Sequence, residues 1–341
     1  MFEGFCGNAH VTEALERMLG HGRLAQTLLF SGAEGVGKAT LARRLAAQIL
    51  PDPARIELDD LSLPENLEIV AGREKLAPEK RNEDPLLFAS HPDFVTFAPD
   101  GPLRQISIQQ TRLLKERSQF LPNKGSRRVF LIDRVDRAND QAANSLLKTL
   151  EEPPDHLILI LTAENAYDLL PTIRSRSVPF QFAPLSPEEM ARFVRSRGLD
   201  HPERRIALAG GSPGAAVTLD LEAYDKRRAA MLALLRVAAG AAPFATWLPV
   251  SEAIARSRNE KLELYLKVLY ELLRDLLLLE EGAGAIRNAD IARELEALAA
   301  KVSFAWLRKA IERTDEIARL IRRNIQKSIA LDAMIAELRG S

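Results

Sequence analysis

The chain has 341 residues, and its 47 lysine and arginine residues balance 47 aspartate and glutamate residues, so the formal net charge is zero. At about 150 residues per domain, this length predicts two or three domains. A composition of 46% hydrophobic and 28% charged residues excludes a disordered chain, and the charge balance excludes a strongly basic nucleic-acid coat. The single cysteine, Cys6, excludes an internal disulfide framework and a cysteine-based zinc module. The beginning of the chain lacks signal-peptide features, and charged residues interrupt the most apolar stretch, so we expect a cytoplasmic protein without a membrane span.

Short apolar runs alternate with helical patterns in the first half of the chain. Residues 27–31, 128–133 and 157–162 are each predicted as strands, and 104–108 is predicted as a further strand followed by a helix that reaches Phe120. Residues 38–50 carry a helix-period apolar face. Continuous apolar strands separated by helices predict a parallel sheet that is covered by helices on both faces.

The pattern changes after residue 183. Ser186-Pro-Glu-Glu189 is typical of a helix start, and we expect no strand beyond it. We predict an α/β domain over 1–183, a helical domain over 184–240 and an all-helical domain over 241–341. Within the first domain, 51–95 shows little periodicity and is predicted to be an irregular insertion.

A phosphate-binding loop is predicted between the first strand and its helix. Gly32, Gly35 and Gly37 are followed by Lys38 in a GxxxxGK pattern. The glycines allow backbone N–H groups to converge on a phosphate, the helix N-terminus adds positive potential, and the lysine reaches the β- and γ-phosphates.

Two catalytic groups are missing around this loop. The position after Lys38 should carry the hydroxyl that ligates magnesium, but it is Ala39, and Thr40 lies about 100° further round the helix. Asp133 ends the strand at 128–133 as a Walker B-type aspartate, and Arg134 follows it where hydrolysing enzymes have an acid. A guanidinium cannot act as a base at neutral pH. We therefore expect little hydrolysis, and weak ATP or ADP binding stays open.

Five motifs in a fixed order carry a resemblance to a known family. They are Asn144-Ser-Leu-Leu-Lys-Thr-Leu-Glu-Glu-Pro-Pro154, the strand 157–162, Thr172-Ile-Arg-Ser-Arg-Ser177, Gly210-Gly-Ser-Pro-Gly-Ala215 and the helix 321–331. This series resembles the clamp-loader branch of the AAA+ ATPases over nearly the whole chain. The resemblance implies a RecA-like AAA+ domain, a three-helix lid and a helical collar domain that assembles with other subunits.

The resemblance also implies residue roles. Arg176, in a Ser-Arg-Ser version of the family's Ser-Arg-Cys motif, would be an arginine finger that acts in trans on a neighbour's ATP site. Arg174 is either a helper or a surface charge, and Gly214 occupies the place of the family's sensor-2 arginine. A degenerate nucleotide site would comprise Gly32, Gly35, Gly37, Lys38, Thr40, Asp133 and the sensor-1 residue Thr162.

These departures resemble a non-hydrolysing subunit of the clamp loader. Such a subunit would assemble with gamma/tau and delta subunits, and through the complex it would act on the sliding clamp and on primer-template DNA. No cofactor is required, and we predict no zinc, because the region that holds a zinc module in several relatives has only His91 and no cysteine.

Two rival functions stay open. An active ATPase of the gamma/tau type would need Thr40 at the metal and another acid, such as Asp136, in place of Arg134. A DNA-binding scaffold would use a basic cluster at Lys124, Arg127 and Arg128, which otherwise lies in a solvated loop.

The C-terminal region carries an apolar stripe that is predicted to pack its own domain. Phe304 and Trp306 are either core residues or interface anchors. The stripe consists of Leu266, Leu269, Leu273, Leu276, Leu277, Ile321, Ile325, Ile329 and Ile335.

Overall fold

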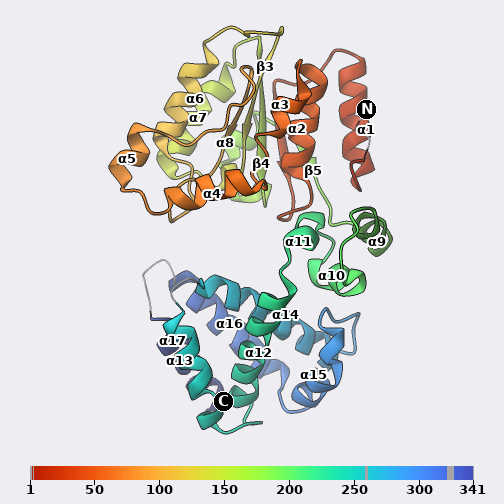
Figure 1. The fold of residues 1–341 in the computed structure, drawn as a ribbon, viewed down its shortest axis with the longest axis vertical. Helices are drawn as coiled ribbons and strands as arrows, with labels where there is room; N and C mark the ends of the chain where they lie inside the picture. Colours follow the sequence, from red (N-terminus) through yellow and green to blue (C-terminus); the bar gives the residue numbers. More distant parts are fainter. Residues whose placement is uncertain (1, 3, 258–259, 321–325, 341) are drawn as a thin grey trace. The chain divides into compact units, whose positions relative to one another are not determined.

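The computed structural model describes residues 2, 4–257, 260–320 and 326–340 (Figure 1). The chain divides into two compact units, Met1–Leu199 with Gly211–Val217, and Asp200–Gly210 with Thr218–Ser341. The division into three domains at 183/184 and 240/241 stays a prediction.

The first unit is built on a parallel five-stranded sheet with the order β2-β3-β4-β1-β5. The strands are β1 (Thr27–Ser31), β2 (Phe94–Phe97), β3 (Arg128–Ile132), β4 (Leu157–Ala163) and β5 (Val178–Gln181). Every residue of β1 to β4 is buried, as expected for strands whose two faces are both covered. The predicted parallel sheet is confirmed, and so are three of the predicted strands.

Helices cover both faces of this sheet. Side chains of β1 alternate between the two cores: Leu28 and Phe30 pack with Leu41 of one face, whereas Leu29 packs with Leu146 of the other. Figure 1 shows α1 and α2 on one side of the sheet and α6 and α7 on the other. The helices of this unit outside 51–95 are α1 (Ala9–Gly20), α2 (Lys38–Ile49), α6 (Ile108–Ser118), α7 (Asp140–Glu151), α8 (Pro171–Arg174), α9 (Pro187–Ser196) and α11 (Pro213–Thr218).

The predicted strand at 104–108 is wrong. These residues form only isolated bridges, and the strand next to β3 is β2. The reason lies in Ser107, whose side chain accepts from the Gln110 N–H while the Gln110 side chain accepts from the Ser107 N–H. This capping box starts α6 at Ile108 and ends any extended run.

The expectation of an irregular segment over 51–95 is also wrong. Three short helices lie there, α3 (Pro53–Glu57), α4 (Pro64–Arg73) and α5 (Pro78–Glu83), each with a proline in its first turn. Proline at this position starts a helix without losing a hydrogen bond, and helices of this length show little periodicity in the sequence.

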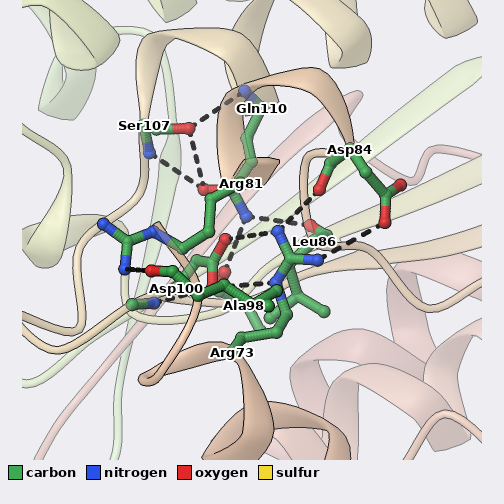
Figure 2. Close-up of polar contacts among 10 residues, drawn as sticks. Arg73, Arg81, Asp84, Leu86, Ala98, Asp100, Ser107 and Gln110 are labelled. Atoms are coloured by element: carbon green, nitrogen blue, oxygen red, sulfur yellow. Dashed lines mark hydrogen bonds and ion pairs between the residues drawn. The ribbon is translucent and has the colours of Figure 1, made fainter. Parts of the chain in front are cut away.

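A buried polar network holds this segment on the sheet (Figure 2). The Arg73 guanidinium donates to both carboxylate oxygens of Asp100, at 2.9 and 2.7 Å, and to the Asp84 carbonyl at 2.6 Å. Beside it, the Gln110 amide donates to the carbonyls of Leu86 and Ala98, each at 2.8 Å. These polar contacts fix the segment together with a small apolar cluster that includes Val70 and Leu86.

The second unit consists of helices joined by turns and loops, with no strand among its described residues. Its core surrounds Trp247, which is fully buried and donates from Nε1 to Asp332 Oδ1 at 2.5 Å. The α-helices are α10 (Pro202–Ala209), α12 (Leu221–Ala238), α13 (Leu248–Arg256), α14 (Leu262–Glu280), α15 (Ala292–Ala299), α16 (Phe304–Leu320) and α17 (Lys327–Arg339).

Most of the predicted C-terminal stripe is buried here. Leu266, Leu269, Leu273, Leu276 and Ile335 lie in the core, and Leu277 packs against it. Ile329 is an exception, since its side chain is exposed. Ile321 and Ile325 lie outside the described residues. Trp306 is buried and Phe304 is exposed, so only the former is a core residue. No helix in the described part of the chain is long and apolar enough to cross a membrane.

Candidate functional site

The predicted phosphate loop lies between β1 and α2, at the carboxyl edge of the sheet. Gly32, Gly35 and Gly37 all have positive φ angles, of 148°, 76° and 102°, which residues with a Cβ rarely adopt. A Cβ at Gly37 would also lie 2.9 Å from the Phe5 ring. The glycines that the pattern singled out are therefore required by the backbone itself.

The Lys38 side chain turns back onto this loop. Its Nζ donates to the carbonyl oxygens of Gly32, at 2.6 Å, and of Ala33, at 2.8 Å. Burial lowers the pKa of Lys38, although the nearby Asp133 acts in the opposite direction. The cation that the motif assigns to a phosphate is thus bound to oxygens of its own loop.

Asp133 and Thr162 meet at the ends of adjacent strands. Thr162 Oγ1 donates to Asp133 Oδ1 at 2.6 Å and accepts from the Arg134 N–H at 2.8 Å. Burial raises the pKa of Asp133, and the Thr162 hydrogen bond only partly offsets it. The structure therefore places Lys38, Asp133 and Thr162 near one another, and the Thr162 hydroxyl donates its hydrogen bond to the aspartate.

Arg134 bridges two acids that the sequence analysis did not identify. Its guanidinium forms an ion pair with Glu164, which follows β4, and another at 3.2 Å with Glu34 in the phosphate loop. Burial raises the pKa of Glu164, but the hydrogen bond and charge of Arg134 outweigh it, and the resulting pKa lies below the ordinary value. Arg134 thus links the phosphate loop to the end of β4, and its positive charge is paired with two carboxylates.

Residues 211–217 also contact the phosphate loop. Ser212 Oγ donates to the Glu34 carbonyl and the Gly214 N–H donates to the Gly35 carbonyl, both at 2.9 Å. A Cβ at Gly214 would lie 2.9 Å from the Gly35 Cα. Gly214, which the resemblance aligned with the sensor-2 arginine, therefore permits a close backbone contact.

The remaining residues of the predicted site lie at its margin. Ala39 and Thr40 are half-buried on the first turn of α2. Asp136, the acid that an active ATPase would need, has one buried carboxylate oxygen without a hydrogen-bond partner, and burial raises its pKa.

Arg176 lies just after α8 and is exposed. Its Nη1 donates to the Thr172 carbonyl at 3.0 Å, and its Nη2 donates to Glu151 Oε1 at 2.8 Å. Arg174 lies over the exposed Tyr167 ring, 5.1 Å from its centroid. The two arginines therefore have different environments, and only Arg176 is paired with a carboxylate here.

The basic cluster before β3 is used within the chain. Lys124 forms an ion pair with Asp52 at 2.7 Å. Arg128 is buried and donates to the carbonyls of Arg117, at 2.8 Å, and Phe120, at 3.2 Å. Arg127 donates to the Asp155 carbonyl, and each of the three cations thus has a partner within the chain.

His91 belongs to a buried hydrogen-bond network. It is fully buried, and its Nδ1 accepts from the Asp93 N–H at 3.0 Å. The Asp93 carboxylate in turn accepts from the N–H groups of Asn123 and Lys124, each at 2.7 Å. Among the described residues, no cluster of three or more histidine, cysteine or acidic side chains could hold a metal ion.

Comparison with known proteins adds a family to this geometry. The family described as "DNA polymerase III, delta subunit" matches residues 82–186. The chain is 32% identical over 215 residues to the DNA polymerase III subunit delta′ of Pseudomonas aeruginosa, covering 62% of this chain and 60% of that one. It is 31% identical over 226 residues to the subunit gamma/tau of Mycobacterium tuberculosis, covering 62% of this chain and 35% of that one.

The matched part is thus less than two thirds of each of these relatives. A solved Thermotoga maritima protein related to the gamma subunit aligns over 96% of this chain and 98% of its own, with 18% identity and a TM-score of 0.47. The family match includes β3, Asp133, the LLKTLEEPP run and Arg176, and the delta′ and gamma/tau relatives agree with it. Over these matched parts, the chain is similar to delta, delta′ and gamma/tau subunits of DNA polymerase III.

Proposed function

We propose that this chain is a delta prime-like subunit of a replicative clamp loader, which does not hydrolyse ATP itself and donates Arg176 to the ATP site of a neighbouring subunit. The observation that carries the proposal is the contrast between two sets of cations. Lys38 and Arg134 are engaged by oxygens around their own phosphate loop, whereas Arg176 is exposed.

We expect a nucleotide to bind weakly at the phosphate loop, because Lys38 and Arg134 already have partners there. A triphosphate would have to replace the Gly32 and Ala33 carbonyls at Lys38 and separate Arg134 from Glu34 and Glu164. Ala39 supplies no hydroxyl for magnesium. Around the loop as the structure describes it, Ala39 then replaces the hydroxyl that would hold the metal and Arg134 replaces the acid that would orient the attacking water, and phosphoryl transfer depends on that positioning.

Arg176 suits a role in trans. A guanidinium is planar and permanently charged, and it stabilises the charge that develops on a transferring phosphoryl group. In the assembled loader, the chain would contact gamma/tau and delta subunits, and the complex would bind the sliding clamp and primer-template DNA. With a net charge of zero on this chain, affinity for DNA would belong to the complex.

An ATPase of the gamma/tau type is the second candidate, because gamma/tau relatives match over a similar part of the chain. Magnesium-dependent hydrolysis by the purified chain separates the two. We expect none above background, and robust turnover that is lost in Lys38→Ala would establish the ATPase instead.

The finger is tested in a loader reconstituted from this chain and its own gamma/tau and delta subunits. Arg176→Ala should leave assembly intact and reduce hydrolysis at one interface by about 10³-fold or more. Arg176→Lys should restore little, because lysine lacks the planar fork. Arg55→Ala, at an exposed arginine on α3, is the control. Unchanged hydrolysis and clamp loading in Arg176→Ala would refute the finger.

A further inference from the structure

The guanidinium of Arg176 is held against its own subunit by three contacts. Nη2 lies 2.8 Å from Glu151 Oε1, and Nη1 lies 3.0 Å from the Thr172 carbonyl and 3.4 Å from Ser175 Oγ. The carbonyl and the hydroxyl are neutral, so they orient the cation without cancelling its charge. Glu151 is different, because it pairs the cation with an anion.

Glu151 also has an electrostatic reason to keep this partner. It is the last residue of α7, and Glu152 follows it directly. A carboxylate at a helix C-terminus is repelled by the negative end of the helix dipole, and here two acids lie side by side. Arg176 pairs directly with Glu151, and Lys148 adds a second positive charge in the last turn of α7.

The ion pair works against a role of Arg176 in trans. A triphosphate that approaches the pair meets the Glu151 carboxylate as well as the guanidinium, and like charges repel. The Nη2 hydrogen that is donated to Glu151 is not available to a phosphate oxygen. The finger therefore acts fully only after the carboxylate has been displaced.

We propose that Glu151 is a positioning residue that retains Arg176 on its own subunit, so that engagement of a neighbour's phosphates requires exchange of the Glu151 carboxylate for a phosphate oxygen. This inference rests on the proposed function, because it presumes that Arg176 acts in trans. Glu151 does not touch the nucleotide. It sets the fraction of subunits whose arginine is free to engage.

The exposure of the Arg176–Glu151 pair sets how much its separation should change the rate of hydrolysis. The Arg176 and Glu151 side chains are 33% and 48% exposed, and solvated pairs of this kind contribute a factor of about 1.5 to 5 to an equilibrium. Removal of the charge in Glu151→Gln should therefore raise single-turnover hydrolysis by the loader by about 1.5- to 5-fold. The increase should appear in the maximal single-turnover rate constant, and the ATP concentration that gives half of this maximum should not change, because the finger acts on the transition state.

The experiment uses the reconstituted loader with four variants: Glu151→Gln, Glu152→Gln, Arg176→Ala and the double variant Glu151→Gln/Arg176→Ala. Glu152→Gln is the matched control, since it removes the same charge one residue away and should leave the rate unchanged. The double variant should be as slow as Arg176→Ala, because without the arginine there is nothing to retain. Higher salt should narrow the difference between Glu151→Gln and the wild type, because it screens an exposed pair.

The outcomes separate the two proposals. If Arg176→Ala slows hydrolysis while Glu151→Gln matches the wild type or is slower, Glu151 does not retain the finger and the proposed function stands. If Arg176→Ala has no effect, the proposed function fails and this inference fails with it. Should Glu151→Gln not assemble, Glu151→Asp, which keeps the charge on a shorter side chain, should give a smaller increase, and no increase would overturn the inference.

Discussion

The network around Arg73 offers a quantitative test of what holds the segment between α2 and β2. The side chains of Arg73 and Asp100 are only 9% and 8% exposed, and two hydrogen bonds join them. The contact with the Asp84 carboxylate is longer, at 3.5 Å, and that side chain is 90% exposed. The stability of the segment should therefore depend on the Arg73–Asp100 pair.

Arg73→Met keeps most of the side-chain volume and removes the guanidinium. It leaves the Asp100 carboxylate buried with the Gly101 N–H, at 2.6 Å, among its remaining donors. Breaking a buried pair on one side costs about 3–5 kcal/mol. The double variant Arg73→Met/Asp100→Leu should recover most of that loss, because no unpaired charge remains.

Hydrogen exchange measured by mass spectrometry under mildly denaturing conditions is the suitable assay, because a chain of two units does not unfold in one step. Peptides that cover α4 and α5 should lose protection in Arg73→Met. Arg256→Met breaks an exposed pair with Glu252 and should cost less than about 0.5 kcal/mol. If Arg73→Met changed protection no more than this control, the ion pair would not be what holds the segment.

Three further predictions concern other parts of the chain. Burial raises the pKa of Asp133 above its ordinary value of 3.8. At pH values between 3.8 and the raised pKa, the folded chain therefore binds more protons than the unfolded chain, and the folded state loses stability as the pH rises through this interval. At pH values above this interval, Asp133→Asn should therefore raise Tm, and this gain in Tm should vanish near about pH 4. A gain of constant size from acid to neutral pH would contradict the pKa shift. Trp247→Ala should lower the free energy of unfolding of the second unit by about 3–5 kcal/mol, and Asp332→Asn should lower it by about 1 kcal/mol. Both losses are measured as lost hydrogen-exchange protection in α13 and α17. Equal losses would argue that the hydrogen bond, and not the packing of the Trp247 ring, stabilises this core. Dialysis against EDTA should leave Tm unchanged and elemental analysis should find no stoichiometric zinc; bound zinc with a lowered Tm after its removal would show that a metal site exists.

The strands that could be predicted are those with long apolar runs. β1, β3 and β4 each contain an unbroken run of buried apolar residues, and such runs can be recognised without knowledge of the neighbouring strands. β5 escaped prediction because it is an edge strand with Pro179 inside it and exposed residues at alternate positions. β2 has only four residues, and the apolar residues around Ser107 resembled a strand more closely until the capping box assigned them to a helix start.

The candidate site was predictable in its motif residues and not in their partners. The GxxxxGK pattern identifies Lys38 because its spacing is local. The pairing of Arg134 with Glu34 and Glu164 depends on the strand order, which places the ends of β3, β4 and β1 side by side. Two acids at the carboxyl ends of predicted strands were a usable signal, since ligand sites of parallel sheets lie at that edge.

Lys38 and Arg176, which the motifs assign to phosphate, share one property with Arg134, which lies beside the phosphate loop. Lys38 binds two carbonyls of the phosphate loop, Arg134 binds two carboxylates, and Arg176 binds one carboxylate and neutral oxygens. For each, the cost of binding phosphate is the loss of these contacts. That cost is highest where the cation is buried, because a charge separated from its partner there is poorly solvated, and lowest at the exposed Arg176. Under the proposed function, this difference would disfavour a nucleotide on this chain's own loop and would make Arg176 the cation that a neighbouring subunit's phosphates recruit at least cost.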